Sequence, residues 1–285
     1  MRPDVITWLD SAGLSPLTRL IPQPGVVYSI VVIVAGTVFL YRARAVGIAP
    51  TRSLEIILTA AVSGAIGARL FFLLTTGDLL RTGPSTWLDP SRGTASWGAW
   101  LGAIGGVLAY TGFSRMSPWP ILDTAISCGG LAEFIGRWSC VLAGDDFGRV
   151  SSASWAIRFP ENSLAYQAQV TRGVLSPEAT ASLPVHPFQF YLMVNGLLLF
   201  LLLSAVWRRK RSRPGHILVL YLIGYGSTRF FWEFFRDPAA GGAEGTLSVS
   251  QWMCLAFLIV GAGILLRSRR RSPPDRRSPQ RTPAT

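Results

Sequence analysis

The sequence predicts an all-α membrane protein with about seven transmembrane helices. The mean hydropathy is +0.37, and only 15% of the residues are charged. Apolar runs close to 20 residues recur along the chain, and about 20 residues cross a hydrocarbon core of ~30 Å as a helix. Basic residues gather in the short segments between these runs. We expect spans at residues 25–40, 54–75, 95–111, 121–142, 187–206, 217–235 and 249–266.

The placement of the basic residues predicts the orientation in the membrane. The segments after the first, third, fifth and seventh spans hold most of the 27 basic residues. Since Lys and Arg favour the cytoplasmic side, we expect the N-terminus outside and the C-terminus in the cytoplasm. Residues 1–24 then form an external segment, residues 25–266 form the transmembrane domain with a long external loop at about 143–186, and residues 267–285 form a disordered basic tail in the cytoplasm.

Composition also limits the kinds of partner that the chain is expected to bind. The formal net charge of +12 would suit nucleic acid, but its location between apolar runs and in the tail fits membrane topology and lipid headgroups better. The three cysteines have no metal-binding spacing. We therefore expect no nucleic-acid partner, no metal and no cofactor, with membrane lipids as the surroundings.

Three arginines fall inside or at the ends of apolar spans, namely Arg69, Arg137 and Arg229. Burying an arginine near mid-bilayer costs about 2.5–3.5 kcal/mol, so such residues usually have a partner or a task. Glu133 precedes Arg137 by four residues and Glu233 follows Arg229 by four, which allows internal ion pairs on one helix face. Three arginines on three spans nevertheless favour an anionic ligand, because guanidinium groups donate in pairs to phosphate.

Polar residues cluster in the segments next to these arginines. Residues 136–149 join the fourth span to the external loop, which we interpret as a cap facing the substrate. Residues 186–191 open the fifth span, and residues 225–236 end the sixth. The polar or glycine positions that these segments contribute are Gly144, Asp145, Gly148, Arg149, His186, Tyr225, Arg229, Glu233 and Arg236.

The ordered set of motifs resembles the bacterial prolipoprotein diacylglyceryl transferase family over nearly the whole chain. Residues 67–71 resemble its GGRLxY segment, and residues 136–149 its signature GRxGNFxNGExxGR. Residues 186–191 resemble HPxQLYE, and residues 225–236 resemble YxxxRFxxEFFR. Tyr28 lies where the family has a tyrosine in its first span.

The resemblance implies an enzyme of the bacterial inner membrane that crosses it several times. It would move the diacylglyceryl group of phosphatidylglycerol to the lipobox cysteine of a prolipoprotein, the first step of lipoprotein maturation. Arg137 and Arg229 would hold the phosphate. The proton acceptor for the thiol stays open between His186, Asp145 and Tyr225, and the arginines alone could instead lower the pKa of the thiol. The implied lipid-binding set also includes Tyr28, Arg69, Gly144, Gly148, Arg149, Glu233 and Arg236.

Several positions depart from the family pattern. Trp97 stands where well-known members have a histidine, and Cys140 and Ala143 replace two asparagines of the signature. These departures motivate an alternative, a catalytically altered or inactive relative that binds phospholipid or lipopeptide. A transporter has less support, because no internal repeat is visible.

Overall fold

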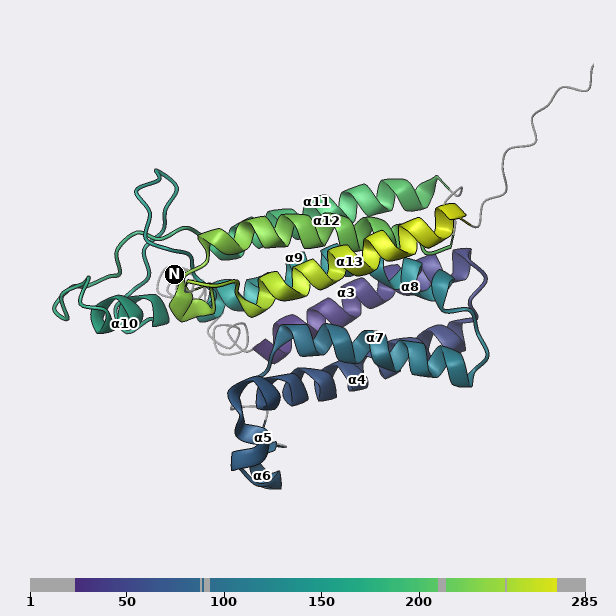
Figure 1. The fold of residues 1–285 in the computed structure, drawn as a ribbon, viewed down its shortest axis with the longest axis horizontal. Helices are drawn as coiled ribbons and strands as arrows, with labels where there is room; N and C mark the ends of the chain where they lie inside the picture. Colours follow the sequence, from purple (N-terminus) through teal and green to yellow (C-terminus); the bar gives the residue numbers. More distant parts are fainter. Residues whose placement is uncertain (1–23, 88, 90–92, 210–213, 244, 271–285) are drawn as a thin grey trace, which may run out of the picture.

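The computed structural model describes residues 24–87, 89, 93–209, 214–243 and 245–270, which are helical and contain isolated β-bridges but no strand. The predicted segment 1–24 and tail 267–285 lie almost entirely outside the described residues. The long helices run side by side along the longest axis (Figure 1). The helices are α3 (Pro24–Ala45), α4 (Pro50–Thr76), α5 (Asp78–Arg81), α6 (Pro84–Trp87), α7 (Ser96–Phe113), α8 (Pro118–Ile126), α9 (Gly129–Ala143), α10 (Leu164–Thr171), α11 (Phe188–Arg208), α12 (His216–Trp232) and α13 (Val249–Arg270), with 3₁₀ turns η2 (Glu233–Phe235) and η3 (Pro238–Ala240).

The chain is a membrane protein by the length and composition of its helices. Among the described residues, four helical stretches are long and apolar enough to cross a membrane: 26–45, 50–76, 188–208 and 249–268. Large apolar side chains on these helices point outward, for example Ile33, Leu58 and Ile259. Such exposure is unfavourable in water but expected where a helix faces lipid. The membrane fold class is confirmed, and these four predicted spans agree with the helices to within a few residues.

The predicted fourth span is wrong as a single helix. It is divided into α8 and α9 by a turn at Ser127 and Cys128. A broken helix exposes backbone carbonyls, which need a partner when they are buried. Arg42 supplies one, because its Nη1 donates to the Ser127 carbonyl at 2.9 Å while its Nη2 donates to Ser204 Oγ at 2.7 Å. Arg42 was expected in a cytoplasmic segment, but it lies buried within α3.

Helices α4 and α7 pack through glycines. A Cβ atom added to Gly67 would clash with the carbonyl of Gly98 and lie 2.8 Å from the Cα of Gly102. Two backbones can approach this closely only without side chains between them, which is how many membrane helices associate. The pair is the α4–α7 hairpin, and its α5–α6 extension projects away at one end (Figure 1).

The external loop is folded. It contains α10, and a small apolar core of Phe147, Phe159, Ala165 and Val185 holds it together. Bridges join Val150 and Ile157 to Val185. We call residues 144–187 the cap. Figure 1 shows α10 at the end of the molecule where α3 begins and from which α5 and α6 project.

We predict that Gly67→Ala lowers the melting temperature in detergent, with a cost of about 1–3 kcal/mol from overpacking. The matched control is Gly105→Ala on α7, where an added Cβ meets nothing within 4 Å. That control should keep or slightly raise the melting temperature, since alanine favours a helix over glycine. Equal behaviour of the two variants would contradict the close α4–α7 packing.

Candidate functional site

The arginine–carboxylate network consists of Arg137, Arg229, Arg236, Glu133, Asp146 and Glu233. It lies where α9 and α12 meet the cap. Helix α9 contributes Glu133 and Arg137 one turn apart, and the cap contributes Asp146 just after that helix ends. Helix α12 contributes Arg229, and the tight turn η2 that follows it places Glu233 and Arg236 nearby.

Glu233 is the most enclosed member of the network, with a side chain that is 0% exposed. One carboxylate oxygen, Oε2, pairs with Arg229. The other, Oε1, lies 3.2 Å from Nη1 of Arg236 and accepts a hydrogen bond of 2.9 Å from Ser248 Oγ. A buried carboxylate requires such compensation for its lost hydration. Glu233 therefore ties the end of α12 to the segment that starts α13.

Asp146 joins the other two arginines. It pairs with Nη1 of Arg137, and its Oδ1 lies 2.6 Å from Nη2 of Arg236. Burial alone would raise the pKa of this carboxyl, but the guanidinium groups of Arg236 and Arg137 outweigh burial and hold the pKa below its usual range. Asp146 is thus an anion at neutral pH.

An unusual backbone places Asp146 there. Gly144 ends α9 with φ of +69° and Asp146 itself has φ of +54°, both in the left-handed region. Gly148 then passes so near His186 and Phe235 that an added Cβ would lie 2.6 Å from the His186 carbonyl. The amide of Arg149 donates to the carbonyl of Phe235 at 2.9 Å. Gly144 and Gly148 thus allow the tight turn at this point of the chain.

Glu133 completes the network deeper in the bundle. Its Oε1 lies 3.6 Å from Nη2 of Arg137 and accepts a hydrogen bond of 3.3 Å from the hydroxyl of Tyr225. Its Oε2 is buried and has no hydrogen-bond partner among the described residues. Three arginines and three carboxylates balance in formal charge. The side chains of Arg137 and Arg236 keep 17% and 18% exposure, whereas Arg229 keeps 4%, so a ligand reaches the first two more readily.

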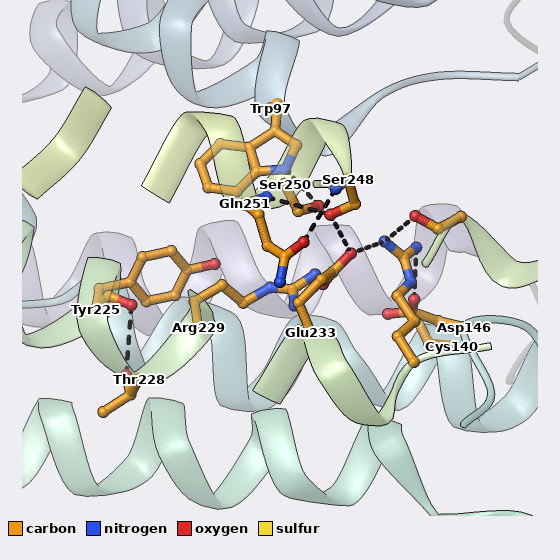
Figure 2. Close-up of polar contacts among 12 residues, drawn as sticks. Trp97, Cys140, Asp146, Tyr225, Thr228, Arg229, Glu233, Ser248, Ser250 and Gln251 are labelled. Atoms are coloured by element: carbon orange, nitrogen blue, oxygen red, sulfur yellow. Dashed lines mark hydrogen bonds and ion pairs between the residues drawn. The ribbon is translucent and has the colours of Figure 1, made fainter. Parts of the chain in front are cut away.

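Helix α13 and helix α7 close the network on one side (Figure 2). Ser248 and Gln251 stand beside Glu233, with the Ser248 amide donating to Gln251 Oε1 at 3.0 Å. Trp97 donates from its indole nitrogen to Ser250 Oγ at 3.0 Å and packs edge-on against Tyr225 and Phe257. The indole therefore fixes α7 to α13 and α12 with its single donor in use.

The comparisons with known proteins point to one family. The chain matches the family model for prolipoprotein diacylglyceryl transferase over residues 21–267. A phosphatidylglycerol–prolipoprotein diacylglyceryl transferase 2 of Clostridium perfringens is 30% identical over 82% of this chain and 85% of its own length. Relatives named phosphatidylglycerol–prolipoprotein diacylglyceryl transferase from Paracidovorax citrulli and Chlorobaculum tepidum are 32% and 33% identical, over 61% and 60% of this chain and 59% and 55% of their own lengths.

The chain belongs to the prolipoprotein diacylglyceryl transferase family. The suspected resemblance is thereby confirmed. Four of the site residues that the family resemblance implied belong to the arginine–carboxylate network: Arg137, Arg229, Glu233 and Arg236. A fifth, Tyr225, donates a hydrogen bond to Glu133 of the network. Asp145 adjoins this network within the cap turn.

Other residues suggested by the diacylglyceryl transferase motifs lie outside the network. Arg69 donates to the carbonyls of Thr86, Trp87 and Gly93, so its guanidinium holds the segment after α5. Tyr28 is 55% exposed on α3. Arg149 is exposed and donates to the carbonyls of Arg236 and Ala243.

His186 also stands apart from the network. Its Nδ1 lies 3.0 Å from the hydroxyl of Tyr191, which accepts a hydrogen bond of 2.8 Å from Trp155 Nε1. The direction of the contact between the hydroxyl and Nδ1 follows the tautomer of the imidazole, because a hydroxyl can both donate and accept hydrogen bonds. Burial lowers the pKa of His186, which keeps the imidazole neutral near pH 7. The histidine thus joins the cap to the start of α11.

Sequence reasoning missed Asp146, Ser248 and Gln251 as partners of the arginines. Asp146 was not singled out from the sequence, because its contacts with Arg137 and Arg236 depend on a left-handed backbone. The only signal for Ser248 and Gln251 was their polarity at the start of an apolar span.

We predict that Asp146→Asn destabilises the protein by about 3 kcal/mol, because it removes the shared anion of the two partly buried guanidinium groups of Arg137 and Arg236. The measurement is the melting temperature in detergent. Glu55→Gln is the control, since the Arg52–Glu55 pair is about half exposed (50% and 47%) and such pairs contribute about 0–1 kcal/mol. A loss for Asp146→Asn no larger than that of the control would contradict the bridging role.

Proposed function

We propose that this protein transfers the diacylglyceryl group of phosphatidylglycerol to the lipobox cysteine thiol of prolipoproteins, the first step of bacterial lipoprotein maturation. The observation that carries the proposal is the convergence of Arg137, Arg229 and Arg236 beside the cap in a member of this family. Each relative named above carries phosphatidylglycerol and prolipoprotein in its own name.

The network suits a leaving phosphate. When the bond between the diacylglyceryl carbon and the phosphate oxygen breaks, a phosphodiester with one charge becomes a monoester with two. Guanidinium groups held in place in a water-poor site stabilise charge that develops in a transition state. Arg137 and Arg236 are the accessible members, and the lipid phosphate would take a share of the donors that now serve Asp146. Arg229 pairs with Glu233, and its guanidinium carbon lies 5.3 Å from the centre of the Phe188 ring. It adds a third positive charge next to the two accessible arginines.

The alternative of an inactive, lipid-binding relative receives no support from the described site. The arginines on which phosphate binding depends are present, and every network carboxylate has at least one basic partner. The departures at Trp97 and Cys140 affect neighbours of the network and leave its ion pairs intact.

We also propose seven crossings of the bacterial cytoplasmic membrane, with α8 and α9 together making the fourth. The N-terminus lies outside and the C-terminus inside. Figure 1 supports this arrangement, because α3 begins and α13 ends at opposite ends of the bundle. The cap lies at the end where α3 begins, so the network opens toward the outer face, where prolipoproteins arrive.

We predict that purified protein in vesicles of phosphatidylglycerol adds a diacylglyceryl group to a lipobox peptide, read as a mass increase. Arg137→Gln should lower the rate by about 10²–10³-fold, the usual cost of one group that stabilises transition-state charge. Arg52→Gln, a change at a half-exposed arginine on α4, should leave the rate unchanged. Absence of any adduct from the unaltered protein would refute the transferase proposal.

We predict that the two sides of the bundle label from opposite sides of the membrane. Ser176→Cys lies on the exposed surface of the cap and should react with an impermeant maleimide added to intact spheroplasts. Ser117→Cys, in the turn before α8, should react only after the membrane is opened. The unaltered protein is the background control: Cys128 and Cys254 are buried, and any labelling of the partly buried Cys140 is subtracted. Reversed labelling would refute the orientation.

A further inference from the structure

We propose that the carboxylate of Asp145 accepts the proton of the acceptor thiol in this protein. The inference rests on the proposed transferase function and identifies the proton acceptor among the residues of the site. The thiol must lose its proton because the thiolate is the nucleophile. Three kinds of observation single out Asp145.

The first is that Asp145, unlike Glu133, Asp146 and Glu233, makes no ion pair with an arginine. Asp146 and Glu233 each contact two arginines, and Glu133 contacts Arg137 and Tyr225. Asp145 makes no ion pair with any described residue, and its Oδ1 is buried without a hydrogen-bond partner among them. A buried oxygen with an open lone pair can take a proton, whereas an oxygen held by guanidinium groups resists protonation.

The second observation is that the competing groups are engaged. His186 Nδ1 is engaged with the Tyr191 hydroxyl at 3.0 Å, in a cluster with Trp155 that lies apart from the arginine network. The Tyr225 hydroxyl donates to Glu133, deep between α9 and α12. The indole of Trp97 has a donor and no acceptor. Each candidate that sequence reasoning left open beside Asp145 is therefore already committed to another contact.

The third observation is that a thiol fits beside Asp145. Sγ of Cys140 lies 4.0 Å from Nη1 of Arg137 and interacts with the Asp145 carboxyl. A sulfur thus already sits between a guanidinium and this carboxylate. An incoming peptide thiol that approached from the cap side would meet the same pair of groups. Gln189 holds the backbone of Asp145 through a hydrogen bond to its carbonyl, which fixes the turn.

The charges around Asp145 favour the role. On its own turn it faces Asp146; from α9 it faces Arg137 and Cys140; from the segment after α12 it faces Arg236. Burial and the neighbouring Asp146 raise the pKa of Asp145, against the lowering effects of Cys140, Arg137 and Arg236. A raised pKa makes the carboxylate a better base near neutral pH. It is ionised above that pKa and loses its acceptor capacity as the pH falls.

The step balances without a co-reactant. The S–H proton moves to Asp145, the sulfur electron pair forms the S–C bond to the diacylglyceryl carbon, and the C–O bond to phosphate breaks. Glycerol phosphate leaves as a dianion held by Arg137 and Arg236. The proton on Asp145 then passes to water or to the departing phosphate, which restores the carboxylate.

The test compares a cysteine peptide with a matched selenocysteine peptide in phosphatidylglycerol vesicles, using the full-length protein. A selenol is ionised near neutral pH, so it needs no base. Asp145→Asn should lose about 10²–10⁴-fold with the cysteine peptide, the range typical of general base catalysis. With the selenocysteine peptide it should come within about tenfold of the unaltered protein. Asp145→Glu, which keeps a carboxylate, should retain most activity, and its pH–rate profile should keep an acid limb that Asp145→Asn lacks.

Each other result overturns a specific claim. Full activity of Asp145→Asn on the cysteine peptide, or an equal loss on both peptides, would overturn the base assignment while leaving the transferase function standing. Loss of activity in Asp145→Glu together with a normal melting temperature would also overturn it. Glu178→Gln on the exposed surface of the cap is the control and should match the unaltered protein. No adduct from the unaltered protein with either peptide would instead refute the proposed function.

Discussion

The buried ion pairs of Glu233 and Asp146 hold the cap end of this molecule together. Glu233 joins α12 to the start of α13 through Arg229 and Ser248, and Asp146 joins the cap to α9 and to the segment after α12. None of these charges could be tolerated alone beside the apolar bundle, because an unpaired buried ion costs several kcal/mol. The positions of the helix ends are therefore set by charge as much as by apolar packing.

A balanced network also prepares the site for an anion. The guanidinium groups are already desolvated and oriented by their carboxylates, so little reorganisation precedes phosphate binding. A phosphate that enters beside Arg137 and Arg236 competes with Asp146 for the same donors. In the proposed reaction, Asp146 would pair with the arginines again when the products leave. The internal carboxylate would thus keep the arginines paired between turnovers.

Physical rules applied to the sequence reached much of this arrangement but not all of it. Long apolar runs predicted the four long apolar helices, and the four-residue spacing of Glu133 with Arg137 and of Arg229 with Glu233 predicted ion pairs that the structure contains. These are local relations along one helix. The contacts of Asp146 with Arg236 and of Arg42 with the Ser127 carbonyl join residues far apart in the chain. Such contacts follow from a left-handed turn and a broken helix, which no periodic pattern signals.

The chemistry of Trp97 separates two roles within the site, holding helices together and exchanging a proton. An indole donates one hydrogen bond and accepts none, and Trp97 uses it on Ser250 while its ring fills the space against Tyr225 and Phe257. The residue therefore fixes helices and cannot exchange a proton. The arginines that we propose bind phosphate are unaffected by this residue, because they depend on α9, α12 and the cap. Under the proposed mechanism, the proton then goes to a group that makes no ion pair with the arginines. The turn that places Asp146 between two guanidinium groups leaves its neighbour Asp145 without such an ion pair. One left-handed turn thus separates the carboxylate that organises charge from the carboxylate that can accept a proton.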